Sequence, residues 1–235
     1  HGMDADPFFV DEGDLDAAVA SARRSFASWA ATPADRRGAI LSQAARILHA
    51  EVPRLGMVIS QEVGKPLAQS EWEVGVAADT LQWFAEEGRR AYGRVIPGRW
   101  DGVGFRTLRQ PVGVVVALAT WNFPVINAAR KIGAALAAGC TCVYKPDEEA
   151  PASGLAVPQA LLAAGLPPGV LSVVFGDPAA VSSHLLDCQG VRKLSFTGSV
   201  PVGRHLGRLA AERGIRTTME LGGHAPVIVC ADADL

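Results

Sequence analysis

The chain has 235 residues, of which 49% are hydrophobic, so it is long enough to bury a sizeable core. Its formal net charge of −2 gives no basic surface of the kind that binds nucleic acid or anionic membranes. No apolar run approaches the roughly 18 residues that a membrane-spanning helix needs, and no signal-peptide pattern opens the sequence. We therefore expect a globular cytoplasmic protein with neither nucleic acid nor a membrane as its partner.

The first part of the chain, residues 1–93, is predicted to be mostly helical. Apolar residues recur at helical spacing from Leu15 to Trp29. Further helical patterns cover residues 34–50 and 71–93, and the stretch VGKPL breaks them apart. In the following residues 94–110, Asp-Gly at 101–102 is a turn signal between β-branched and aromatic residues, so we expect a projecting β-hairpin.

From residue 111 to residue 235, short β-rich runs alternate with helical ones. The expected strands cover residues 112–120, 140–145, 170–176, 191–198 and 225–230, and residues 215–221 form either one more strand or the lead into a glycine turn. Helices are expected near 124–139, 151–165, 178–187 and 200–213, with Pro158 interrupting the second. This alternation predicts a Rossmann-like α/β fold, a mostly parallel sheet with helices on both faces.

The four cysteines are interpreted as buried, reduced thiols. Cys140, Cys142, Cys188 and Cys230 lie in apolar runs, without C-x-x-C spacing or a nearby cluster of histidines. Core packing therefore explains them better than a metal site or a redox pair. We predict no metal centre.

Two strand-to-helix junctions carry residues suited to a nucleotide, since open parallel sheets bind ligands at the carboxyl ends of their strands. Thr197, Gly198 and Ser199 sit at a helix N-terminus, which suits an anion, although an ordinary helix cap explains them equally well. Lys145 and Glu148 follow a strand and are suited to both hydroxyls of a ribose, with solvent-facing charges as the alternative. The carboxylate would repel a 2′-phosphate and so favour NAD over NADP.

Two other junctions suggest chemistry. In TWNFP, Asn122 can direct an amide N–H at an oxygen that develops negative charge, with packing and capping as the alternative. In MELGGHAPVIV, Glu220 precedes Gly222 and Gly223, where the backbone can approach a ligand closely. The alternative is a carboxylate that lies in solvent at a strand end.

The stretches TWNFP, GAALAAGCTCVYKPDEEAP, SFTGSVPVG and MELGGHAPVIVCADADL, in this order, resemble the aldehyde dehydrogenase superfamily. The likeness covers most of the chain, and Thr120 replaces the proline common before WNFP. It implies that Asn122 is the oxyanion-hole amide. It also implies that Glu220 is a partly buried general base that activates the deacylating water, rather than a carboxylate in solvent. It also implies that Lys145 and Glu148 hold the adenosine ribose, within a cofactor-binding set of Thr120, Trp121, Asn122, Lys145, Glu148, Gly176, Gly198, Ser199, Leu221 and Gly222.

A narrower likeness is to NAD-dependent succinate-semialdehyde dehydrogenases. Arg130, in NAARK, corresponds to the arginine that helps to bind the distal carboxylate of the substrate in that group. The alternative is a surface arginine on the polar side of a helix. His224 in ELGGHAP fits the same group and is given no catalytic role. The resemblance thus implies a small acid semialdehyde as substrate, without distinguishing succinate, glutarate and 2-oxoglutarate semialdehydes.

The family mechanism also requires a nucleophilic cysteine a few dozen residues beyond the acid of ELGG, and only fifteen residues follow Glu220. We therefore expect the chain to stop before the catalytic domain and to lack turnover by itself. The family implies a homodimer or homotetramer that forms partly through the hairpin arm. A non-enzymatic nucleotide-binding or assembly module, or an aldehyde dehydrogenase for another substrate class, remain the alternatives.

Overall fold

The computed structural model describes residues 10–234, and its first part is helical as expected. A capping box starts the first helix: the Asp11 carboxylate accepts from the Asp14 N–H, and the Asp14 carboxylate accepts from the Asp11 N–H. The sequence analysis did not identify the third helix, which ends at Gly64 in the left-handed conformation with φ +69°. The helices are α1 (Glu12–Ala31), α2 (Ala34–Ala50), α3 (Val52–Val63), α4 (Leu67–Glu87) and the short 3₁₀ helix η1 (Gly88–Arg90).

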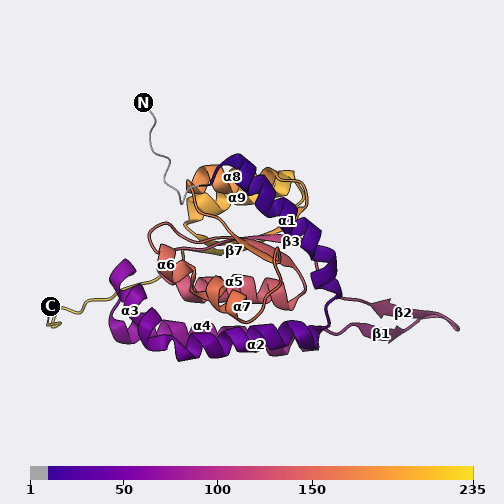
Figure 1. Ribbon diagram of the computed structural model, residues 1–235, viewed down its shortest axis with the longest axis horizontal. Coiled ribbons are helices and arrows are strands. Elements are labelled where there is room, and N and C mark those ends of the chain that lie inside the picture. The colour runs from indigo at the N-terminus through magenta and orange to yellow at the C-terminus, as the bar shows by residue number, and fades with distance from the viewer. Residues whose placement is uncertain (1–9, 235) are drawn as a thin grey trace.

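The predicted hairpin is confirmed and projects from the body of the molecule (Figure 1). Strands β1 (Arg94–Pro97) and β2 (Gly104–Thr107) pair antiparallel. Gly102 in the connecting turn has φ +75°, a conformation that favours glycine, which explains the Asp-Gly signal. Both strands are exposed along their whole length, so the arm packs on no other described part of the chain.

A parallel five-stranded sheet forms the centre of the fold, in the order β5-β4-β3-β6-β7. Its strands are β3 (Val114–Leu118), β4 (Thr141–Lys145), β5 (Leu171–Val173), β6 (Val191–Gly198) and β7 (Arg216–Leu221). The connecting helices are α5 (Pro124–Ala137), α6 (Pro151–Gly154), α7 (Ala156–Ala163), α8 (Pro178–Asp187) and α9 (Val200–Glu212). The Rossmann-like prediction is therefore confirmed.

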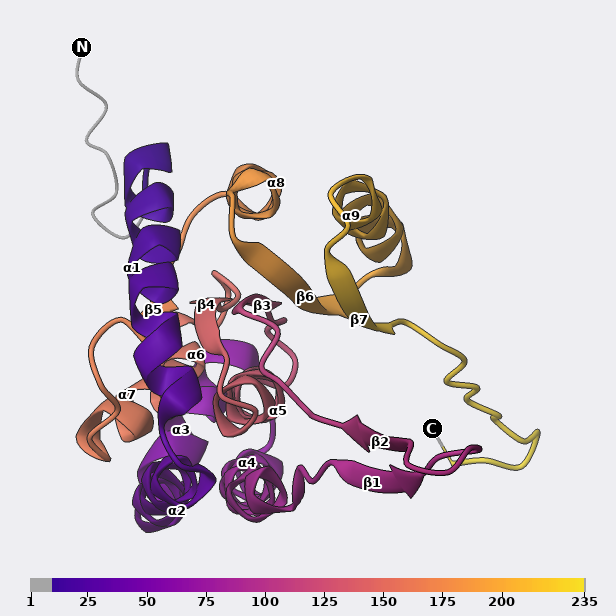
Figure 2. The ribbon, with the colours of Figure 1, turned by 90° about the vertical axis from the view of Figure 1, so that its right-hand side faces the viewer.

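Helices cover both faces of this sheet (Figures 1 and 2). On one face, α1, α8 and α9 pack around Val114, Val116 and Leu118. On the other face, α5 and α7 pack around Val115 and Ala117, and α2 and α4 form a further layer behind these two helices. Because β3 is buried on both faces, its sequence is a continuous apolar run rather than an alternating one. No helix among residues 10–234 is both long enough and apolar enough to cross a membrane.

Two sequence-based predictions differ from the structure. The fifth strand of the sheet is β7, whereas residues 225–230 form no strand. Val227 and Ile228 are 87% and 85% exposed, because no strand edge lies beside this segment in the described chain (Figure 2). Pro158 does not interrupt its helix either: the break lies at Leu155, which places Pro158 in the first turn of α7, where a missing N–H costs no helical bond.

The strand order reverses direction between β3 and β6. From β3 the chain moves outward through β4 to β5, and then returns to place β6 and β7 on the other side of β3. In an open parallel sheet, the crevice at the carboxyl ends of such neighbouring strands is the usual ligand site. The fold therefore directs attention to the loops that follow Leu118 and Gly198.

Candidate active site

Two adjoining cavities lie at this reversal point. The larger, of about 630 Å³, opens between α4, α5 and the end of β7, and the smaller, of about 180 Å³, lies between the end of β4 and α9. Thr120, Thr197, Gly198 and Ser199 line both cavities. The four junctions singled out in the sequence, at Asn122, Lys145, Ser199 and Glu220, therefore meet at these two adjoining cavities.

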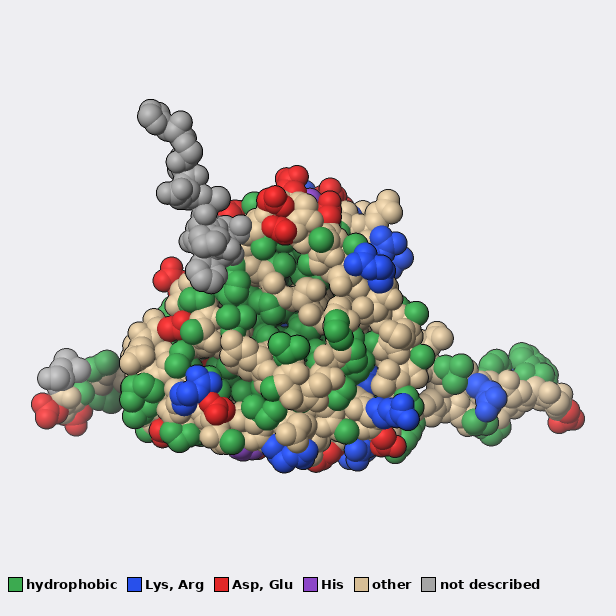
Figure 3. All heavy atoms as spheres, viewed as in Figure 1, with side chains coloured by type: hydrophobic (Ala, Val, Ile, Leu, Met, Phe, Trp, Pro, Cys, Tyr) green, Lys and Arg blue, Asp and Glu red, His purple; other side chains and the backbone are tan. Residues whose placement is uncertain are grey.

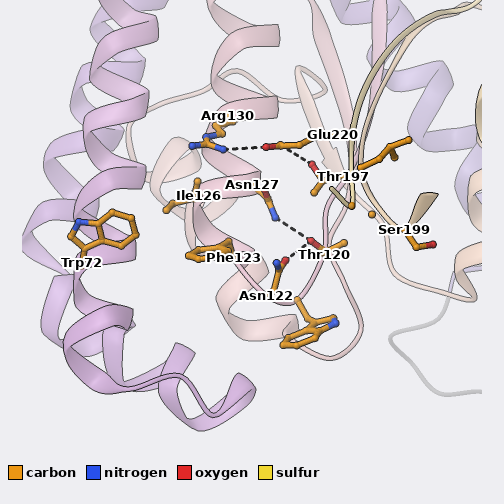
Figure 4. A pocket seen from close by; sticks show the side chains of 14 residues that line it. Trp72, Thr120, Asn122, Phe123, Ile126, Asn127, Arg130, Thr197, Ser199 and Glu220 are labelled. Carbon is orange, nitrogen blue, oxygen red and sulfur yellow. Dashed lines mark hydrogen bonds and ion pairs between the residues drawn. The ribbon is translucent and has the colours of Figure 1, made fainter. Parts of the chain in front are cut away.

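Asn122 sits in the wall of the larger cavity with its amide group partly engaged (Figure 4). Asn127 Nδ2 donates to the Thr120 hydroxyl at 3.2 Å, and that hydroxyl donates to Asn122 Oδ1 at 2.7 Å. Thr120 thus forms a link that a proline at this position could not supply. The Thr120 hydroxyl engages Oδ1 of Asn122, whereas its Nδ2 makes no hydrogen bond to the described residues. The N–H groups of Asn122 are therefore available to an oxygen in the cavity.

A buried ion pair, which the sequence analysis did not identify, supports the same loop from α4. Glu73 is fully buried, and its Oε1 accepts from the backbone N–H groups of Val125 at 3.0 Å and of Ile126 at 3.4 Å. Lys65 binds the other carboxylate oxygen and donates to the Asn122 carbonyl at 2.7 Å. Glu73 and Lys65 therefore hold both the first turn of α5 and the backbone of Asn122 in place against α4.

Glu220 lies at the end of β7, opposite Thr197 in the pairing of β6 with β7. The Thr197 hydroxyl donates to Glu220 Oε2 at 3.2 Å, and Lys131 Nζ donates to the same hydroxyl at 2.7 Å. Burial lowers the pKa of Lys131 to about 8, against the smaller opposing effect of Glu220. Hydrogen bonds through Thr197 thus connect the exposed Glu220 carboxylate to a buried amine whose pKa is lowered to about 8.

The expected partial burial of Glu220 is wrong for the described chain, because its side chain is 57% exposed. It lies at the outer edge of the sheet, on the strand that has a neighbour on one side only. Arg130 Nη1 lies 3.5 Å from Glu220 Oε1, and both side chains face the larger cavity (Figure 4). Nothing in the sequence indicated that Arg130 and Glu220 form an ion pair, because α5 and β7 are brought together only by the fold.

The smaller cavity contains the two residues expected to hold a ribose. Lys145, at the end of β4, is 5% exposed, and its Nζ donates to the Glu148 carboxylate and, at 3.3 Å, to the Pro146 carbonyl. The pair therefore offers one ammonium and one carboxylate at a fixed position beside α9. Such a pair can bind neighbouring hydroxyl groups as both donor and acceptor.

Ser199 and Gly198 line both cavities. Ser199 precedes α9 and makes no side-chain capping bond, so the N-terminus of this 13-residue helix is open to an anion. A Cβ on Gly198 would lie 2.3 Å from Phe196 Cζ, which leaves no room for a side chain. An uncapped helix end between a larger cavity and a Lys-Glu pair fits the pyrophosphate and ribose of a dinucleotide.

The remaining predicted cofactor residues divide between the cavity and its surroundings. Trp121, Leu221 and Gly222 line the larger cavity. Leu221 also packs on α9, since a Cβ on Gly203 would lie 2.3 Å from Leu221 Cδ2. Gly176 lies outside both cavities, against Val181, with φ +149°.

The expectation of four core cysteines holds for Cys140 and Cys142 only. Both are buried, and burial raises the pKa of the Cys142 thiol. The expectation is wrong for Cys188, which is half-buried, and for Cys230, which is exposed in the segment that forms no strand. None of the four lines the larger cavity.

Comparison with known proteins agrees with the geometry. The model of the aldehyde dehydrogenase family matches residues 9–235. The 4-(hydroxymethyl)benzenesulfonate dehydrogenase TsaD1 of Comamonas testosteroni is 47% identical, over 94% of this chain and 46% of the relative. The NADP(+) succinate-semialdehyde dehydrogenase GabD of Escherichia coli K12 is 43% identical, over 93% and 45%. The crystal structure of succinate-semialdehyde dehydrogenase from Burkholderia pseudomallei has a TM-score of 0.91 at 42% identity, over 96% and 47%.

The chain spans about half the length of the curated relatives that it matches. Within that half, the match runs through the hairpin, the sheet and all the strand-end junctions described above. By sequence and by fold, this chain belongs to the aldehyde dehydrogenase family, whose members oxidise aldehydes with NAD or NADP.

Proposed function

We propose that this chain is the cofactor-binding portion of an NAD-dependent dehydrogenase that oxidises a small acid semialdehyde to the carboxylic acid. The observation that carries the proposal is the meeting of Asn122, Arg130 and Glu220 around one cavity. An amide donor, a cation and a carboxylate there serve three different needs of the reaction. The cavity adjoins the smaller one, which suits a dinucleotide.

Each of these residues has one proposed role. The free N–H of Asn122 stabilises the aldehyde oxygen as it gains negative charge. The Arg130 guanidinium holds the distal carboxylate of the substrate, since its several N–H donors can serve that group beside Glu220. Glu220 takes a proton from the water that releases the acid, and Thr197 orients its carboxylate.

The chemistry of the proposed reaction needs two further groups. Lys145, Glu148 and the N-terminus of α9 would hold the dinucleotide, which would supply a hydride acceptor for the substrate carbon. The nucleophile is a cysteine thiolate, which we assign to a part of the protein outside the present sequence, because none of the four cysteines lines the larger cavity. This portion of the protein then supplies the oxyanion donor, the base and the substrate cation.

The preference for NAD over NADP is proposed from Glu148, and calorimetry on the present chain can test it. We expect NAD to bind at micromolar concentration and NADP at least about tenfold more weakly, because the Glu148 carboxylate repels a 2′-phosphate. Glu148→Ala should remove most of that difference. The exposed neighbour Glu149 gives a matched control, since Glu149→Ala should leave it intact. Equal affinities of the unmodified chain for the two dinucleotides would refute the role of Glu148.

The substrate assignment is tested by kinetics of the full-length protein. Arg130→Ala should raise KM for succinate semialdehyde by about 10- to 100-fold, the value of one charge-assisted contact, and change KM for an uncharged aldehyde little. Arg204→Ala, at an exposed position outside both cavities, is the control. An equal effect on both aldehydes would remove the argument for a distal carboxylate.

A second candidate is an aromatic aldehyde with an anionic group. Trp72, Trp121 and Phe123 line the same cavity as Arg130 and are exposed, so they offer flat apolar surface beside a cation. The name of the Comamonas relative describes a dehydrogenase for a benzenesulfonate. A Trp72→Ala variant separates the candidates: KM should rise for 4-formylbenzenesulfonate if that is the substrate, and stay unchanged for succinate semialdehyde.

The hairpin supports an oligomer, the usual state in this family. Val95, Trp100, Phe105 and Leu108 are exposed on or beside the arm, where hydrophobic side chains gather (Figure 3). Such a surface favours association with another copy. We propose a homodimer or homotetramer built through the arm, and light scattering of a Phe105→Asp variant tests it by the loss of the larger species. A purely structural or nucleotide-binding module would associate in the same way but would show no turnover at full length.

A further inference from the structure

A second group of reactive side chains lies on the face of the sheet covered by α1 and α8, outside both active-site cavities. Asp16 on α1 meets His184 on α8 and Cys188 directly after α8. Asp16 Oδ1 lies 2.9 Å from His184 Nε2 and 3.4 Å from Cys188 Sγ, and the three ligand atoms all lie within 4.8 Å of one another. A carboxylate oxygen, an imidazole nitrogen and a sulfur thus converge on one point.

The helix itself sets up two of these three ligands. His184 lies in the last turn of α8, and Cys188 is the C-cap residue, whose N–H donates to the His184 carbonyl at 3.1 Å, so the two side chains lie one turn apart. Asp16 approaches from α1, which packs against α8. The side chains of His184 and Asp16 are 23% and 67% exposed, so an ion can reach the point where they meet, and the Asp16 carboxylate has room to adjust.

The geometry suits a tetrahedral ion with bonds of about 2.0 to 2.3 Å, which requires its ligand atoms to be about 3.3 to 3.8 Å apart. The Asp16–Cys188 separation already has that value, and the Asp16–His184 separation needs to open by about half an ångström. Sulfur and imidazole ligands together with one carboxylate favour zinc over magnesium or calcium, which prefer oxygen alone.

The electrostatic surroundings also favour a cation. The N-cap Asp11 and the first-turn residues Glu12 and Asp14 of α1 lie close to Asp16 in the sequence, and acidic side chains gather over this end of the molecule (Figure 3). Arg213, which directly follows α9 and lines the cavities at Cys188 and His184, is paired with Asp187. A cavity of about 500 Å³ is lined by Cys188, and another of about 740 Å³ is lined by His184, so solvent reaches two of the three ligands and a water molecule can serve as the fourth.

We propose that Asp16, His184 and Cys188 form a zinc-binding site that ties α1 to α8. None of the three lines either active-site cavity, so the site is separate from the proposed dehydrogenase chemistry. Bound zinc replaces the Asp16–His184 and Asp16–Cys188 hydrogen bonds by bonds to all three side chains, and so holds α1 and α8 together on their face of the Rossmann-like sheet. The sequence analysis assigned no metal site because Asp16 lies 168 residues from His184 along the chain.

Cobalt titration of the purified 235-residue chain under a phosphine reductant tests this proposal, since Co²⁺ takes the place of Zn²⁺ in tetrahedral sites and absorbs in the near ultraviolet when bound to a thiolate. We expect one equivalent of Co²⁺ to bind with this thiolate absorption, and Zn²⁺ to displace it. Cys188→Ser should abolish the absorption, and His184→Gln and Asp16→Asn should each weaken binding at least about tenfold.

Two controls keep the test specific. Cys230→Ser removes the exposed cysteine, and His49→Ala removes a histidine that pairs with Asp79 at 3.1 Å without a neighbouring thiol. Neither should change the titration, and circular dichroism checks that every variant is folded. Absorption that persists in Cys188→Ser, that disappears in Cys230→Ser, or that never develops at millimolar Co²⁺ would overturn the proposal.

Discussion

Replacement of Glu73 should destabilise the protein far more than its single charge suggests. Glu73 is fully buried and accepts from the Val125 and Ile126 N–H groups and from Lys65. A Glu73→Ala change leaves an ammonium and two backbone donors without their acceptor. Removal of one partner from a buried ion pair costs about 3 to 5 kcal/mol, because the other charge stays desolvated.

Two substitutions of graded severity make the magnitude measurable. Glu73→Gln keeps an acceptor for the two N–H groups and removes only the charge, so we expect a loss of about 2 kcal/mol in the free energy of unfolding. For Glu73→Ala we expect about 4 kcal/mol, a large share of the 5 to 15 kcal/mol typical of a domain. The Lys65 ammonium keeps two contacts in both variants: the Asn122 carbonyl at 2.7 Å and the Phe123 ring, whose centre lies 3.7 Å from Nζ. These contacts limit the loss of stability.

Urea unfolding followed by tryptophan fluorescence supplies the assay, with Asp79→Asn as the control on the same helix. Asp79 is paired with His49 at the surface, with 75% of its side chain exposed, so its replacement should cost less than about 1 kcal/mol. A double-mutant cycle with Lys65→Met should give a coupling energy above about 1 kcal/mol. If Glu73→Ala costs no more than Asp79→Asn, the reasoning about this buried pair is refuted.

Two further predictions concern the active-site region. Gly198→Ala should abolish dinucleotide binding measured by calorimetry, because its Cβ would lie 2.3 Å from Phe196 Cζ; Gly207→Ala, whose Cβ meets only Met219 at 3.6 Å, should bind normally. The second concerns pH: burial lowers the pKa of Lys131 from 10.5 to about 8, so the unfolded chain binds more protons between these values and stability rises with pH there. In urea titrations, the free energy of unfolding of the unmodified chain should rise by about 3 kcal/mol relative to that of Lys131→Met between pH 8 and pH 10.5. If the difference in unfolding free energy between the two proteins does not change with pH, the burial argument is contradicted.

Much of the fold could be predicted because its signals are local. The apolar run of β3 reflects burial on both faces, and the alternation of strands and helices fixes a parallel sheet. The junctions at Thr120, Lys145 and Ser199 could be placed in one region because parallel strands bring their carboxyl ends to the same edge. Local signals also explain the Asp-Gly turn of the hairpin.

The errors arose where a pattern depends on a distant partner. Residues 225–230 have the composition of a buried strand, yet a strand forms only beside another strand edge, and the described chain offers none there. The exposure of Cys230 has the same origin. The exposed position of Glu220 follows from β7 being an edge strand, which the sequence left undecided.

The supporting contacts could not be predicted because they join remote parts of the chain. Glu73 lies 52 residues from Val125, and Lys131 lies 66 residues from Thr197. A charged residue in a helical pattern is usually assigned to the solvent face, and only the packing of α4 against α5 shows Glu73 to be buried.

The most direct test of the central claim is a crystal structure of this chain grown with NAD. We predict difference density for the adenosine ribose between Lys145 and Glu148, with the pyrophosphate at the N-terminus of α9 beside Ser199 and the nicotinamide directed into the cavity that holds Asn122 and Glu220. Density for the dinucleotide at any other cavity, or clear density for an unliganded Lys145–Glu148 pair at saturating NAD, would contradict the account.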